Sequence, residues 1–188
     1  MTFYPDLEPC DYFDRHHPDP TYSQAWSPSL RAVGWLGSKV DSTGSVSSSV
    51  RKKLETLAHD PWSPVLFMGG HHCGVCVRKS GEKKLEHLVR EFPPAPDSLT
   101  EDFIENYGER YAPASTAQGF FNLFVPGAGH VYVAPELILH YIDEHQYQPP
   151  RNFCDAVLAC PPMGSTEYFE SLRRNSSGDF RKHVKPGP

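Results

Sequence analysis

The chain has 188 residues, a formal net charge of −5, a hydrophobic fraction of 38%, 19 prolines and 14 glycines. A chain of this length buries roughly 70% of its unfolded surface when it folds, so we expect one domain with its own core. The negative charge argues against a nucleic-acid-binding protein, and the absence of a run of about 18 apolar residues argues against a membrane span.

The cysteines and the opening sequence indicate a reducing compartment. MTFYPDLEPCDYF has neither the basic nor the apolar segment of a signal peptide. Five cysteines are an odd number for a disulfide framework. We therefore expect a cytoplasmic protein whose thiols stay reduced.

The first third of the chain predicts short elements joined by polar loops. Residues 1–30 have little periodicity, which predicts an irregular packed arm. LRAVGWLG at 30–37 predicts a strand, and a helix over about 47–58 would place three apolar side chains on one face. The arm is expected to pack through Phe3, Tyr4, Leu7, Tyr12, Phe13 and Trp26, and the helix through Val50, Leu54 and Leu57.

The middle of the chain predicts one strand and two helices. PWSPVLFMGG at 61–70 reads as a buried strand that ends in two glycines. A short helix is expected around 85–89, before a proline-rich stop. DSLTEDFIENYG at 97–108 predicts a second helix, with a serine or threonine cap and acidic residues in its first turn.

The last third has the clearest pattern. GFFNLFVPGAGHVYV predicts a hairpin with strands at roughly 119–125 and 130–134. Pro135 is expected to open a helix over 135–145, because proline is favoured at the first helical position. Further helices are predicted after QPPR and over 164–175, the former carrying Phe153, Val157 and Leu158. We expect a single domain over 1–175 and a flexible tail over 176–188.

The segment MGGHHCGVC, residues 68–76, predicts a metal site. Two cysteines in a C-x-x-C spacing can direct both thiolates to one ion, and the neighbouring glycines permit a tight turn. If His71 joins Cys73 and Cys76, one short segment supplies three ligands. Tetrahedral zinc needs a fourth, which must come from an element packed against this knuckle.

His140 is the first choice for the fourth ligand. A treble-clef arrangement places a hairpin and then a helix after the knuckle, and the chain has that order, with His140 on the predicted helix 135–145. The site predicted is one Zn²⁺ per chain, held by His71, Cys73, Cys76 and His140. The residues that could replace one of these ligands are His72, His130, His145, Cys154 and Cys160.

Other uses of the cysteine pair fit less well. A redox C-x-x-C opens a strong helix, whereas VRKSGEKK after Cys76 indicates a turn. The metal-site patterns of deaminases and metalloproteases are absent, as are the nucleophile-elbow, Walker and Rossmann patterns. The candidate general bases Glu136, Asp143 and Glu144 are not marked by any motif, so a structural ion is favoured over a catalytic one.

The sequence resembles an uncharacterised bacterial family of small proteins. The resemblance rests on FYPDLEPCDY, VGWLG, GGHHCGVC and VPGAGHVYVAPELILHYIDEHQYQPPRNFCDAVLACP, which together span most of residues 1–161. It implies His71 rather than His72 as ligand, together with Cys73, Cys76 and His140. Members often have Glu after the first knuckle cysteine, where this chain has Gly74. The family has no assigned activity.

These observations predict an α+β fold: a small antiparallel sheet with a treble-clef-like zinc knuckle, hairpin and helix, flanked by short helices. The favoured function is a protein-interaction or accessory module with structural zinc, for example an immunity-type protein, rather than an enzyme. The alternatives are a zinc-dependent hydrolase with an open coordination position and a nucleic-acid-binding treble clef. The sequence does not define an oligomeric state.

Overall fold

The computed structural model describes residues 3–15, 25–65, 70–80 and 116–185. The helices expected around 85–89 and over 97–108 lie outside this part, as do residues 66–69 of the strand expected at 61–70. Residues 61–65 contain no strand. The elements are α1 (Tyr12–Arg15), β1 (Leu30–Ala32), α2 (Ser48–His59), β2 (His71–His72), β3 (Gln118–Gly119), β4 (Asn122–Pro126), β5 (Val131–Pro135), α5 (Ile138–His145), α6 (Arg151–Ala159), α7 (Thr166–Arg174) and α8 (Gly178–His183).

The main sheet has three strands in the order β1-β5-β4. Strands β4 and β5 form the predicted antiparallel hairpin, with Phe124 opposite Val133. Strand β1 pairs parallel with β5, so the sheet is mixed and the expectation of a wholly antiparallel sheet was wrong. The parallel pairing follows because the long connection from β1 to β5 allows the chain to cross over before it returns.

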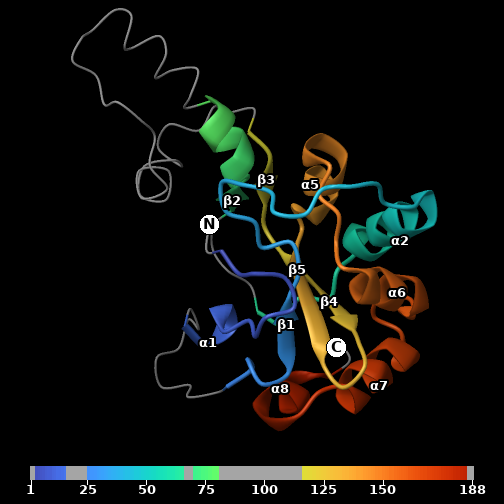
Figure 1. The fold of residues 1–188 in the computed structure, drawn as a ribbon. Helices are drawn as coiled ribbons and strands as arrows, with labels where there is room; N and C mark the ends of the chain where they lie inside the picture. Colours follow the sequence, from blue (N-terminus) through green and yellow to red (C-terminus); the bar gives the residue numbers. More distant parts are fainter. Residues whose placement is uncertain (1–2, 16–24, 66–69, 81–115, 186–188) are drawn as a thin grey trace, which may run out of the picture.

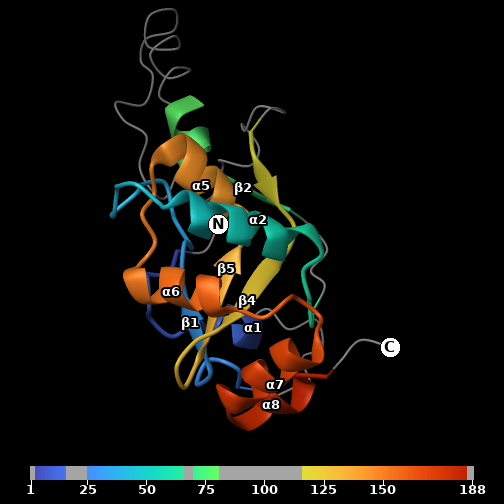
Figure 2. The same ribbon diagram turned by 90° about the vertical axis from the view of Figure 1, so that its right-hand side faces the viewer.

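Strand β5 lies at the centre of the fold. All five of its residues are buried, as expected for a strand covered on both faces. Helices α6 and α7 pack against β4, and α2 packs against α6 and α5. Figures 1 and 2 show α5 with residues 74–80 beyond one end of the sheet and α7 with α8 beyond the other.

The amino-terminal arm is packed as predicted, although not through every side chain expected, and it lies against β1. Tyr4, Tyr12, Phe13 and Trp26 are buried, whereas Phe3 and Leu7 are exposed. Backbone hydrogen bonds hold the arm against the sheet: the amide of Leu7 donates to the carbonyl of Ala32, and the amide of Cys10 donates to the carbonyl of Leu30.

Two helix expectations need correction. Pro135 ends β5 opposite Asn122 instead of opening a helix, and α5 begins three residues later. A proline is tolerated at the end of a strand, where its missing N–H removes no needed ladder bond. Helix α6 buries Phe153 and Val157 as expected, but Leu158 is 49% exposed, since it lies about 100° around the helix from Val157.

The segment expected to be a flexible tail is largely folded. Helix α8 buries Phe180, which stacks on Phe124 of the hairpin with ring centroids 5.7 Å apart. Val184 beyond the helix is also buried, and its carbonyl accepts a hydrogen bond from Arg173 Nε. The core cluster thus includes residues from Tyr4 to Val184.

The predicted α+β class is confirmed, with a three-stranded and a two-stranded sheet surrounded by short helices. The chain order of cysteine pair, hairpin and helix is the expected one. Residues 74–80 are helical, however, so the cysteine pair opens a helix where a turn was predicted. The likeness to a treble clef stays a prediction. No helix of the described segments has both the length and the apolar character needed to cross a bilayer.

Candidate metal centre

The cysteine pair is held where a short strand meets a helix. Strand β2 pairs antiparallel with β3, and the amide of Cys73 donates to the carbonyl of Ala117. The helix at 74–80 then begins, and the amide of Cys76 donates to Cys73 Sγ over 3.4 Å. This is the bond that a helix-capping side chain makes to the third helical residue. Cys73 is fully buried, and Cys76 is half-buried one turn later.

Two histidines reach the cysteines from α5. The helix buries Ile138 and Tyr141 against the core, which turns His140 toward the cysteine pair. His145 is the last residue of the helix, and Gln146 after it adopts a left-handed conformation with φ of 56°. The amide of Tyr147 donates back to the carbonyl of Tyr141, which fixes the end of the helix and therefore the place of His145.

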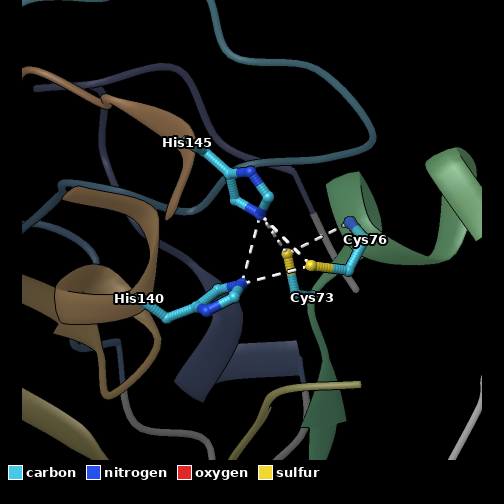
Figure 3. Close-up of side chains that lie close together, drawn as sticks. All are labelled: Cys73, Cys76, His140 and His145. Atoms are coloured by element: carbon cyan, nitrogen blue, oxygen red, sulfur yellow. Dashed lines mark hydrogen bonds between the residues drawn. The ribbon is translucent and has the colours of Figure 1, made fainter. Parts of the chain in front are cut away.

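Four ligand-type atoms converge in the space between the two helices, as Figure 3 shows. His145 Nε2 lies 3.2 Å from Cys73 Sγ and 3.3 Å from Cys76 Sγ. His140 Nε2 lies 3.3 Å from Cys76 Sγ and 3.1 Å from His145 Nε2. All four atoms lie within 4.8 Å of one another. The cluster is a candidate metal site of the Cys2His2 type.

Four of the six distances among these atoms are close to the edges of a tetrahedron around a metal ion. With metal–sulfur bonds of about 2.3 Å and metal–nitrogen bonds of about 2.05 Å, tetrahedral angles give edges of about 3.6 Å for S···N and about 3.3 Å for N···N. The observed S···N and N···N separations, 3.2–3.3 Å and 3.1 Å, are about 0.3 Å shorter. A small outward movement of the side chains would therefore complete the coordination shell.

The electrostatics of the cluster favour a bound cation. Burial lowers the pKa of both His140 and His145, which favours the neutral rings that offer a lone pair to a metal ion. Burial also raises the pKa of the Cys73 thiol. A thiolate here needs a nearby positive charge, and a metal ion supplies that charge and lowers the thiol pKa.

The structure brings together three of the four side chains predicted from the sequence: Cys73, Cys76 and His140. The fourth place in the cluster is taken by His145, one of the predicted alternatives, and not by His71. His71 Nε2 instead forms a hydrogen bond of 3.0 Å with the hydroxyl group of Tyr12. Because β2 pairs with β3, the His71 ring is directed toward the amino-terminal arm.

The remaining candidate ligands lie elsewhere. His72 is within 3.0 Å of the Gln118 amide across the two-stranded sheet. His130 packs edge-on against Tyr132 at the hairpin turn, with ring centroids 4.5 Å apart. Cys154 and Cys160 belong to α6 and its C-terminal end, and all five cysteines are free thiols.

Two of the acids considered as general bases are engaged away from the cluster. Both carboxylate oxygens of Asp143 accept hydrogen bonds of 2.8 Å from Arg51 of α2. Glu136 accepts a hydrogen bond of 2.8 Å from the amide of Phe120. Each carboxylate thus has a structural partner, in one case joining α5 to α2 and in the other closing the loop after β3.

One comparison with known proteins gives a match. Residues 2–158 match a family described as "Domain of unknown function (DUF7919)". No curated protein matches the chain, and no solved structure matches it. The match agrees with the resemblance to an uncharacterised family, and it adds no activity.

Proposed function

The chain belongs to this family of unknown function, and from its cysteine and histidine cluster we propose a zinc-stabilised accessory protein that acts by binding another protein. The observation that carries the proposal is the convergence of four ligand-type atoms, two sulfurs and two imidazole nitrogens, within 4.8 Å of one another. One Zn²⁺ per chain is the ion proposed, because two thiolates and two imidazoles in a tetrahedron are a typical structural zinc set.

The ion would join two parts of the chain that are far apart in sequence. It would tie the start of the 74–80 helix to α5, across more than 60 residues. The ion would add to the pairing of β2 with β3 and to the shared core that already join these segments. Zinc binding of this kind contributes directly to folding free energy.

A closed coordination shell supports a structural role over a catalytic one. A catalytic zinc keeps a position for water beside a general base. Here four protein atoms would fill the shell, and Asp143 and Glu136 are already hydrogen-bonded to other groups. The zinc-dependent hydrolase is therefore the weaker candidate.

A protein partner is favoured over a nucleic acid. The net charge is −5. Arg51, the first residue of the basic run at 51–53, is bound to Asp143 and to Glu55 over 2.8 Å each. Lys83 and Lys84, which could extend a basic patch, lie outside the described residues. We place the protein in a reducing, cytoplasmic compartment, where thiolate ligands are preserved.

Cobalt substitution tests the closed shell. The purified chain is loaded with Co²⁺ in place of zinc, and its visible spectrum is recorded with and without azide. We expect the intense absorption of a tetrahedral sulfur-bound ion and no change on adding azide, because no position is open. An azide-dependent spectrum would overturn the structural assignment and favour the hydrolase. Cys73→Ser should lose the spectrum, whereas Cys160→Ser, outside the cluster, should keep it.

A binding assay tests the choice of partner class. Fluorescence anisotropy with labelled single-stranded DNA, duplex DNA and RNA at physiological salt should show no saturable binding. Saturable binding that weakens steeply with salt would overturn the protein-partner proposal in favour of the nucleic-acid alternative.

A further inference from the structure

A cavity lies away from the metal cluster, at the N-terminal ends of α2 and α6. This cavity of about 540 Å³ is lined by Asp6 of the arm, by residues of the loop before α2 and by residues 148–151 before and at the start of α6. Besides Asp6, its walls combine three serines, Gln148 and Arg151 with apolar groups, among them those of Val46, Val50 and Pro149. A volume of several hundred Å³ that combines apolar walls with polar groups is typical of small-molecule sites.

Asp6 is the one carboxylate in the lining, and it retains unused hydrogen-bonding capacity. Its side chain is half-buried and accepts bonds from two donors, the amide of Gly34 at 2.9 Å and the hydroxyl of Tyr147 at 2.8 Å. A carboxylate has about four lone-pair positions, so acceptor capacity remains. Burial raises the pKa of Asp6. Arg151 is the one cation in the lining; its side chain is 96% exposed and lies 3.9 Å from the Asp155 carboxylate.

The backbone holds this carboxylate in place. Leu7 has φ of 69°, a left-handed conformation that a bulky residue rarely adopts. Its amide is fixed by a hydrogen bond of 2.7 Å to Ala32. Tyr147 is itself buried and its ring hydroxyl contacts both oxygens of Asp6. Backbone strain of this kind is frequent where a side chain is positioned for a ligand.

We propose that this cavity binds a small organic cation, with the ammonium group of the ligand donating hydrogen bonds to Asp6 and its hydrocarbon part packing on Val46, Val50 and Pro149. A charged donor to a half-buried carboxylate gives a stronger bond than a neutral donor. The serines around the cavity provide additional hydrogen bonds for a polar substituent.

Titration of the full chain with n-butylammonium, n-butanol and butyrate tests this proposal, followed by the NMR amide signals of Gly34 and Val50. Butylammonium should give saturable shifts, butanol should bind at least tenfold more weakly, and butyrate should give none. In Asp6→Asn the butylammonium affinity should fall at least tenfold. The matched control Asp41→Asn removes a nearby exposed carboxylate that does not line the cavity, and it should bind as the wild type does.

A second variant covers the case in which Asp6→Asn fails to fold. Ser45→Trp adds a large side chain at the exposed rim of the cavity and should abolish the butylammonium shifts. Absence of saturable binding in the wild type, equal binding of butanol, or undiminished binding by a folded Asp6→Asn or Ser45→Trp chain would overturn the proposal.

Discussion

Replacing His145 by alanine tests which histidine completes the metal site. Its Nε2 atom lies within 3.3 Å of both sulfur atoms and of His140 Nε2. Structural zinc sites bind with about 10–16 kcal/mol. Divided equally over four ligands, this is roughly 2.5–4 kcal/mol for each. Since 1.4 kcal/mol is a factor of ten, His145→Ala should weaken zinc binding by about two to three orders of magnitude.

His71→Ala is the matched control. The two histidines are the rival fourth ligands, yet His71 Nε2 is bonded to the Tyr12 hydroxyl and lies outside the cluster. Zinc affinity is measured by competition with a chromophoric chelator for the wild type and both variants. We expect the zinc affinity of His71→Ala to stay within about threefold of the wild-type affinity. The hydrogen bond between His71 and Tyr12 that this variant loses lies outside the coordination shell. A large loss of affinity in His71→Ala together with little loss in His145→Ala would refute the assignment.

Three further predictions concern stability. Gly74→Ala should lower the melting temperature and weaken zinc binding, because an added Cβ would lie 2.5 Å from the carbonyl oxygen of Gly37, and such overpacking costs about 1–3 kcal/mol. Gly37→Ala is the control and should change little, since its Cβ would meet Phe3 at an ordinary 3.7 Å. Equal melting temperatures of the two variants would contradict the close contact. Phe180→Ala should lower the free energy of unfolding in urea by about 3–5 kcal/mol, because the ring is fully buried. Phe3→Ala, at a half-exposed ring, is the control and should have a smaller effect. A negligible effect of Phe180→Ala would mean that the carboxy-terminal segment is not part of the fold. Removing the metal with a strong chelator should lower the melting temperature of the wild type but not that of Cys73→Ser, and an unchanged wild type would argue against a structural ion.

Local sequence patterns were sufficient to predict several elements. The helix over about 47–58 is observed as α2, with the Ser47 hydroxyl accepting a hydrogen bond from the Val50 amide. The hairpin was predicted because its two strands are apolar and joined by a glycine-containing turn, and β4 and β5 follow that pattern. The residues that specify these elements lie close together in sequence, so the elements form whatever the rest of the chain packs against them.

The parallel pairing of β1 and the folding of α8 depend on distant contacts. Nothing within LRAVGWLG specifies that Leu30 lies beside Val131, a hundred residues later. Phe180 is ordered by packing on Phe124 and Trp26, which no local pattern reveals. Tertiary packing therefore decided how these elements are placed, since the sequence of each segment alone predicted only a strand at 30–37 and a flexible tail at 176–188.

The choice between His71 and His145 shows the same limit. His71 was predicted because one short segment would then supply three ligands, and because the family resemblance implies His71 rather than His72. Pairing of β2 with β3 instead directs His71 to Tyr12. His140 and His145 are five residues apart, about 140° around a regular helix, which does not predict a shared face. They converge because the helix ends at His145 and the backbone turns at Gln146.

X-ray absorption at the zinc edge tests the central claim most directly. The protein is purified without added chelator, and the shell around the ion is fitted for the number and type of ligand atoms. We predict two sulfur atoms at about 2.3 Å and two imidazole nitrogens at about 2.0–2.1 Å, with no oxygen ligand. A shell with fewer than two sulfurs, a water oxygen in the first shell, or a protein that holds no zinc would contradict the closed Cys73, Cys76, His140 and His145 site.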